Sequence, residues 1–118
     1  MNETVSLGHP IPSPLVELIA TRFRILGEPM RIKLLDRLRE GPATVSDLVD
    51  ATGASQQNVS KHLRTLLDAS FVSRTQDGNF ARYAIADEMV FRLCEEVCGG
   101  LRNQVAELEH LIEDGAPR

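Results

Sequence analysis

The chain has 118 residues, of which 42% are hydrophobic and 25% are charged. This length supports about one domain of ordinary globular composition, which excludes a two-domain enzyme, a disordered chain and a fibrous repeat. The formal net charge of −4 argues against a nucleic-acid partner. The charge is uneven, however, because residues 55–83 carry +2 and residues 84–118 carry −5.

The sequence lacks the signals of a membrane or secreted protein. No stretch approaches the roughly 20 consecutive apolar residues that a transmembrane helix needs, and no secretory signal pattern opens the chain. We therefore expect a cytoplasmic protein with no membrane partner. The two cysteines, Cys94 and Cys98, are too few for a disulfide scaffold and are expected to be reduced thiols.

The N-terminal segment resists regular structure. Residues 1–14 contain three prolines together with Gly8 and Ser13, which predicts a flexible arm. We expect one folded domain over residues 15–113 and a disordered tail over residues 114–118.

Two helices are predicted at the start of the domain. Apolar residues recur at helical spacing over residues 15–26, and Gly27 ends the first helix. Pro29 suits the first turn of a second helix, which should run to about Glu40, before Gly41.

The next pair of helices is short and closely spaced. Thr44 and Asp47 have the spacing of a capping box, which predicts a third helix that ends at Gly53. Ser55 is a favourable N-cap for a fourth helix with one narrow apolar stripe. Together they predict a helix-turn-helix over residues 44–68.

A change of periodicity follows the fourth helix. Residues 71–75 and 80–85 are β-prone and are separated by residues 76–79, whose Asp-Gly pair is a strong hairpin signal. A long amphipathic helix is then predicted over residues 87–112, interrupted by two adjacent glycines. The fold class is therefore mainly α with a β-hairpin wing, a winged helix-turn-helix.

The outward face of the fourth helix suits DNA. Its first turn carries amides, which pair with base edges, and basic side chains follow on this helix and on the hairpin, where they neutralise phosphates. The alternative, a solvated polar helix face, is disfavoured by the hairpin and the local positive charge. The expected DNA contacts are Thr44, Ser55, Gln56, Gln57, Asn58, Ser60, Lys61, Arg64, Arg74 and Arg82.

Residues 26–35, with the sequence LGEPMRIKLL, and residues 55–63, with the sequence SQQNVSKHL, resemble the ArsR/SmtB family of bacterial winged-helix repressors. The resemblance extends over roughly residues 15–112. It implies a homodimer built on the first and last helices, a palindromic double-stranded DNA operator and repression relieved by a ligand. It also matches Gln56, Gln57, Ser60 and Lys61 to positions that contact operator DNA.

A dimer is also expected on physical grounds. One short recognition helix buries too little surface for useful specificity, whereas two-fold pairing doubles the contacts over two half-sites. The amphipathic helix over residues 87–112 is a natural interface. The alternative is that this helix packs only on its own domain.

The metal sites known in the family look absent. Residues 44–48 contain no cysteine where many relatives have a pair, and Met89, Gly100 and Asn103 occupy positions of the second family site. His110 and Glu113 supply only two ligands on one helix face. We therefore expect no metal and no cofactor, and the effector stays unknown.

Two further features bear on function. Cys94 and Cys98 share a helix face, which makes them a candidate thiol effector site, and the alternative is that both are small core hydrophobes. His62 is expected to be a packed, hydrogen-bonded residue rather than a ligand.

The sequence thus predicts a sequence-specific DNA-binding transcriptional regulator, a homodimeric repressor released by an unidentified effector. The alternative is a winged-helix module that binds protein without DNA, which the acidic composition suggests. An enzyme is not expected, because no phosphate-binding glycine loop and no nucleophile–base set can be found.

Overall fold

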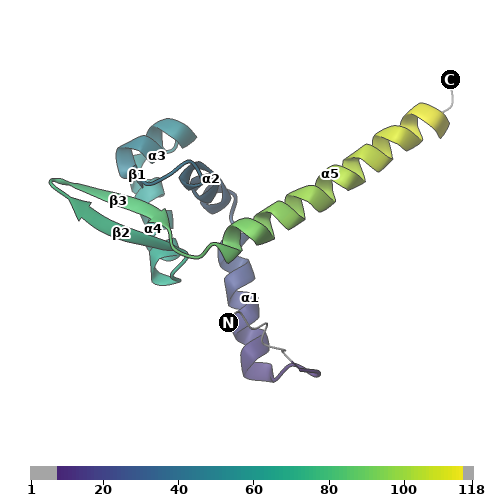
Figure 1. The fold of residues 1–118 in the computed structure, drawn as a ribbon, viewed down its shortest axis with the longest axis horizontal. Coiled ribbons are helices and arrows are strands. Elements are labelled where there is room, and N and C mark those ends of the chain that lie inside the picture. The colour runs from purple at the N-terminus through teal and green to yellow at the C-terminus, as the bar shows by residue number, and fades with distance from the viewer. Residues whose placement is uncertain (1–7, 116–118) are drawn as a thin grey trace. The chain divides into compact units, whose positions relative to one another are not determined.

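The computed structural model describes residues 8–115, and the chain divides into two compact units, Met1–Ile85 and Ala86–Arg118. The first unit holds four helices and a small sheet, and the second holds one long helix (Figure 1). Residues 1–7 of the predicted arm and residues 116–118 of the predicted tail lie outside the described range.

Prolines lie at the start of both of the first two helices, and the sequence predicts this for the second. Helix α1 spans Ser13–Leu26 and so begins inside the segment predicted as an arm. Helix α2 spans Pro29–Leu38, and the Glu28 side chain caps it by accepting a hydrogen bond from the Met30 amide at 2.7 Å. It ends before the predicted Glu40, because the backbone turns tightly over the next residues.

The helix-turn-helix is confirmed. Helix α3 spans Val45–Thr52 and begins with the predicted capping box, in which the Thr44 side chain and the Asp47 side chain each accept a backbone hydrogen bond from the other residue. Gly53 ends it at a φ of 74°, a left-handed conformation that glycine adopts without strain. Helix α4 spans Gln56–Asp68, and Ser55 Oγ accepts from the Asn58 amide at 3.1 Å.

The sheet has three antiparallel strands in the order β1-β3-β2. Strand β1 is Ala43–Thr44, β2 is Val72–Asp77 and β3 is Phe80–Ile85. The β2–β3 hairpin, called the wing below, projects away from the helices (Figure 1). Strand β1 was not predicted, because two residues are too few to show an alternating pattern.

The turn of the wing is tighter than predicted. Gln76 pairs with Ala81 and Asp77 pairs with Phe80, so two residues that were expected in the turn extend β2. A two-residue turn remains, with Gly78 at a φ of 62°. Two-residue hairpin turns need such positive φ values, which explains the glycine.

The core of the first unit joins α2, α3 and α4 to the sheet. Burial of these aliphatic and aromatic side chains, at about 1.5–3 kcal/mol for each large one, fixes α3 and α4 relative to each other. The buried hydrophobic residues of this unit are Leu34, Leu35, Leu38, Ala43, Leu48, Val59, Leu63, Leu66, Phe71 and Val72.

Helix α5 spans Met89–Gly115, and Asp87 Oδ1 accepts from the Met89 amide at 3.0 Å near its start. Its backbone runs through Asp114 and Gly115, so the tail predicted from residue 114 starts too early. The predicted apolar stripe lies largely exposed, with Leu101 56% and Leu108 59% accessible. None of the helices in residues 8–115 combines the length and apolar character of a bilayer-spanning segment.

Candidate nucleic-acid interface

Helix α4 has one buried face and one exposed face. The buried face consists of Val59, His62, Leu63 and Leu66, which point into the core. Successive residues of a helix are rotated by about 100°, so residues away from these positions around the helix axis face outward. We call the outward set the recognition face, and it consists of Gln56, Gln57, Ser60, Lys61 and Arg64, all of them exposed.

The other predicted contact residues are placed around this face. Ser55, Arg74 and Arg82 are exposed, whereas Thr44 and Asn58 are half-buried. The hydroxyl oxygens of Thr44 and Ser55 already accept helix-capping hydrogen bonds. These two residues therefore have a structural task that the prediction of DNA contacts did not include.

The cations near the recognition face differ in their partners. Arg64 Nε lies 3.3 Å from Asp68 Oδ1, and Arg82 Nε donates to Asp77 Oδ2 at 3.0 Å. Both pairs are exposed, where an ion pair contributes only about 0–1 kcal/mol, so a phosphate can compete for either arginine. The Lys61 ammonium makes no ion pair with any residue in 8–115.

The structure does not bring the two wing arginines together. Arg74 pairs with Tyr83 across the hairpin and Arg82 pairs with Thr75, and side chains of directly paired residues share a face. Arg74 and Arg82 therefore project from opposite faces of the wing. Arg82 also pairs with Thr44 of β1, which places these two on the same face.

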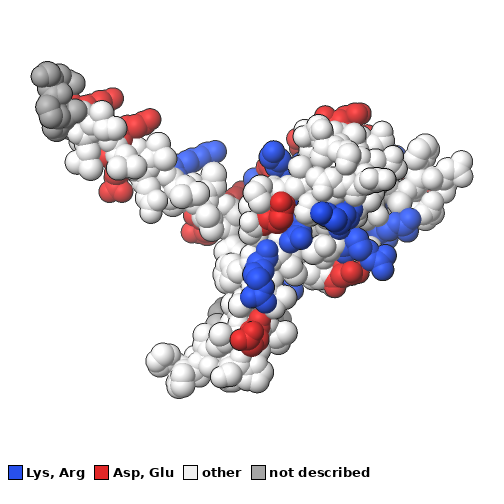
Figure 2. All heavy atoms as spheres, turned by 180° about the vertical axis from the view of Figure 1, so that it is seen from behind, with Lys and Arg blue, Asp and Glu red and all other residues white. Residues whose placement is uncertain are grey.

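Charge is distributed unequally over the surface. Figure 2 shows several basic side chains on the face of the first unit that it displays, whereas acidic side chains are spread along α5. Residues 55–83, which contain α4 and the wing, carry a net +2. This local sign suits a polyanionic ligand although the whole chain is acidic.

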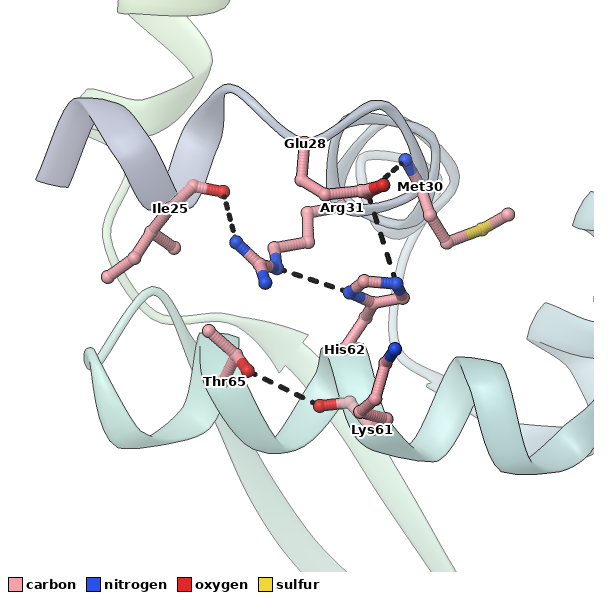
Figure 3. Close-up of polar contacts among 7 residues, drawn as sticks. All are labelled: Ile25, Glu28, Met30, Arg31, Lys61, His62 and Thr65. Atoms are coloured by element: carbon pink, nitrogen blue, oxygen red, sulfur yellow. Dashed lines mark hydrogen bonds and ion pairs between the residues drawn. The ribbon is translucent and has the colours of Figure 1, made fainter. Parts of the chain in front are cut away.

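Behind the recognition face lies a buried polar cluster (Figure 3). His62 is 6% exposed, and its Nδ1 accepts a hydrogen bond from Arg31 Nε at 3.2 Å. The guanidinium also donates through Nη1 to the Ile25 carbonyl at 3.0 Å. Glu28 Oε2 lies 3.9 Å from His62 Nε2. The prediction that His62 is packed and hydrogen-bonded is confirmed.

Sequence reasoning missed the partners of His62. Arg31 and Glu28 are separated from His62 in the sequence by β1 and α3, and no local sequence pattern links them to His62. Burial lowers the pKa of His62, an effect to which the Arg31 and Lys61 charges add and which the Glu28 carboxylate opposes.

The candidate thiol site lies on α5. Cys94 is half-buried and Cys98 is exposed. Within residues 8–115, no three His, Cys, Asp or Glu side chains come close enough together to hold a metal ion.

The architecture defines a class of protein. A helix pair with a tight turn, an outward-facing second helix and an adjoining hairpin make a winged helix-turn-helix, in which the second helix enters the DNA major groove. The sequence model of the family described as "Bacterial regulatory protein, arsR family" matches residues 28–74.

Named relatives agree with this match. The chain is 38% identical over 80 residues to a probable mercury resistance operon repressor of Streptomyces lividans, covering 68% of this chain and 64% of that protein. It is 33% identical over 87 residues to the HTH-type transcriptional regulator NmtR of Mycobacterium tuberculosis, covering 74% of this chain and 72% of that protein. The chain belongs to the ArsR family, as the resemblance predicted.

Solved structures show the same fold. The crystal structure of M. tuberculosis Rv0081 has a TM-score of 0.73 at 31% identity and covers 81% of this chain and 97% of its own. A homodimeric winged helix-turn-helix DNA-binding domain from Mycobacterium bovis, a possible ArsR-family regulator, has a TM-score of 0.66 at 26% identity, covering 98% of this chain and all of its own. The predicted fold class is confirmed.

Proposed function

We propose that this chain is a sequence-specific transcriptional repressor that binds a palindromic DNA operator as a homodimer. The observation that carries the proposal is the recognition face: amides and an ammonium without an ion pair in residues 8–115 project from α4, whose opposite side is anchored in the core. Relatives named as repressors support the direction of regulation. They lend no support to the alternative of a protein-binding module.

The contacts divide into two kinds. We infer that Gln56, Gln57 and Asn58 in the first turn of α4 read base edges, because amides pair bidentately with adenine. Lys61 and Arg64 on α4, with Arg74 or Arg82 on the wing, neutralise phosphates and set the register. Ser60 bonds either a base or a phosphate, while Thr44 and Ser55 chiefly hold the helix starts in position.

Dimerisation is assigned to α1 and α5. Helix α1 has no buried residue, and apolar side chains such as Leu18, Phe23, Leu101 and Leu108 are more than half exposed on the two helices. Apolar surface of this extent is unusual on a monomer and typical of an interface. The homodimeric M. bovis domain supports this assignment.

The effector is left open, with Cys94 and Cys98 as the candidate responsive thiols. They lie four residues apart on one helix face, and Cys98 is exposed to reagents. The chain is inferred to be a regulator that acts on cytoplasmic DNA without catalytic activity, because its family consists of transcriptional regulators.

The test is a fluorescence-anisotropy titration of the reduced, metal-free chain. The probe is a duplex that the chain itself selects from a random-sequence library, and an unrelated duplex serves as competitor. We expect binding that resists the competitor and weakens steeply with salt. Failure to select any duplex, or equal affinity for the competitor at low salt, would overturn the proposed function.

A further inference from the structure

We propose that neutral His62, hydrogen-bonded to Arg31, is a positioning residue for α4, so that protonation of His62 weakens the binding of DNA. The inference rests on the proposed function, since it concerns how the recognition face is held. His62 itself does not reach DNA, because its side chain is buried on the opposite side of α4.

The hydrogen bonds tie α4 to the junction between α1 and α2 (Figure 3). Arg31 lies in the first turn of α2, and its guanidinium bridges the Ile25 carbonyl of α1 and the imidazole of His62 on α4. Glu28, the N-cap of α2, faces the other ring nitrogen and also accepts from the Met30 amide. The cluster thus joins three helices at one imidazole.

The recognition face starts one residue from this imidazole. Lys61 precedes His62 on α4 and is exposed, so a rotation or shift of the helix at His62 moves the Lys61 ammonium directly. The leucines of α4 hold the helix against the core, but apolar contacts have no preferred direction. The bond to Arg31 supplies the directional restraint.

The position of the proton on the neutral His62 ring determines that further protonation breaks the hydrogen bond to Arg31. Nδ1 accepts from Arg31 Nε–H, so it carries a lone pair, and the neutral ring must hold its proton on Nε2, which faces Glu28. Protonation places a second N–H on Nδ1, directly opposite the guanidinium donor. The hydrogen bond is then replaced by two opposed donors and two like charges.

The charged groups around the His62 ring have opposite effects on its protonation. Arg31 from α2 and Lys61 from α4 disfavour the imidazolium, whereas Glu28 at the start of α2 favours it. Burial outweighs the attraction of Glu28 and lowers the pKa of His62. The neutral, bonded ring is therefore the form present at neutral pH, and it is lost only on acidification to pH values below the ordinary histidine pKa of 6.5.

The pH profile of DNA binding tests the proposal. Anisotropy is measured with the duplex selected at about pH 7.5, and the dissociation constant at about pH 5.5 is divided by the constant at about pH 7.5. For the unmodified chain we expect this ratio to be about tenfold, because each of the two subunits contributes an effect of about threefold when its His62 loses the hydrogen bond to Arg31.

Two variants separate His62 from other titrating groups. In His62→Gln the amide oxygen can accept from Arg31 and the amide nitrogen can donate to Glu28, yet nothing titrates, so the ratio should fall to about threefold or less. His110→Gln removes a histidine from α5 and should keep the ratio of the unmodified chain. Equal ratios for the unmodified chain and His62→Gln would overturn the proposal.

A second measurement does not depend on the folding of His62→Gln. Long-range ¹⁵N correlation spectra of the uncomplexed full chain report which ring nitrogen carries the proton. We expect an unprotonated Nδ1 at about pH 7.5, and Arg31→Met should raise the pKa of His62, because it removes both the donor and the like charge. A protonated Nδ1 in the unmodified chain at that pH overturns the inference.

The outcomes also distinguish the two proposals. If no duplex is bound at about pH 7.5, the proposed function fails and the inference fails with it. If a duplex is bound specifically but the pH ratios of the unmodified chain and His62→Gln agree, the function stands and only the role of His62 is overturned.

Discussion

Lys61 is the side chain of α4 whose charge is least compensated. It is exposed on the recognition face and makes no ion pair in residues 8–115, unlike Arg64 and Arg82. A lysine in this situation can meet a phosphate without first breaking another contact. Its contribution to binding should therefore be mainly electrostatic and independent of base sequence.

Replacing Lys61 with alanine should weaken binding to the selected duplex and to the unrelated duplex by a similar factor. The slope of log affinity against log salt should decrease in magnitude by about 2, because each subunit of the dimer loses one phosphate contact and its released counterion. Lys33→Ala is the matched control, since Lys33 is an exposed lysine on α2 outside the recognition face. Identical slopes for both variants would contradict the placement of Lys61 at the backbone.

Ser55 offers a prediction about stability. Its hydroxyl oxygen caps α4 by accepting from the Asn58 amide at 3.1 Å. Ser55→Ala should lower the free energy of unfolding by about 1 kcal/mol, the usual cost of losing such a cap. Ser60→Ala, which removes an exposed hydroxyl from the same helix, should change it by less than about 0.5 kcal/mol. Urea unfolding that gives equal values for both variants would show that the cap contributes nothing.

Helix α3 shows how a local element responds to pH. The hydrogen bonds that Thr44 makes with the Asp47 carboxylate lower the pKa of Asp47 below its ordinary value of about 3.8. A carboxyl with a lowered pKa stabilises the fold above its ordinary pKa, and this contribution is lost as the pH falls through the lowered value.

Asp47→Asn should therefore flatten the acid side of the stability profile. The amide oxygen can still accept from the Thr44 backbone, but it does not titrate. Urea midpoints between about pH 5 and pH 2 should fall less steeply for Asp47→Asn than for the unmodified chain. Asp50→Asn, which removes the same charge from the other end of α3, should retain the steep fall. Parallel profiles for the unmodified chain and Asp47→Asn would refute the capping account.

At the level of elements, the sequence was informative wherever the signal was local. The capping box at Thr44, the cap at Ser55 and the glycine at the end of α3 specify the helix-turn-helix through contacts a few residues apart. Strand β1 was not predicted because it is defined by its pairing with β3. Its own two residues show no strand pattern. The extent of the wing turn likewise depends on cross-strand pairing.

The candidate site shows the same division. Helical periodicity was sufficient to predict which residues form the recognition face, because it depends only on the burial of Val59, Leu63 and Leu66. It was not sufficient to predict that Arg74 and Arg82 lie on opposite faces of the wing, since this follows from the register. The Arg31–His62 bond joins residues 31 positions apart and has no local signature.

At the scale of the whole molecule, α5 carries the apolar surface that dimerisation would cover. Leu101 is 56% exposed and Val105 51% exposed, and both lie on the same side of the helix. Two-fold symmetry brings each such residue into the interface twice, so a single substitution acts at two places.

Leu101→Asp should dissociate the dimer. A buried, unpaired carboxylate at each symmetric position is costly, and we expect the dimer dissociation constant to rise by at least about tenfold. Sedimentation equilibrium measures the change directly, and specific DNA binding should weaken in parallel. Asn103→Asp introduces the same charge on the opposite, polar side of α5 and serves as the control. A dimer of unchanged strength in Leu101→Asp would exclude this stripe as the interface.

Thr44 has a consequence for the choice of DNA. It ends β1, where it pairs with Arg82 of the wing, and its hydroxyl also begins α3. The base of the wing and the helix-turn-helix therefore cannot tilt independently. The distance along the duplex between the DNA contacts of the wing and those of α4 is thus fixed within one subunit. A base pair inserted inside a half-site should abolish recognition, because the wing and α4 are not connected flexibly enough to contact the shifted positions at the same time.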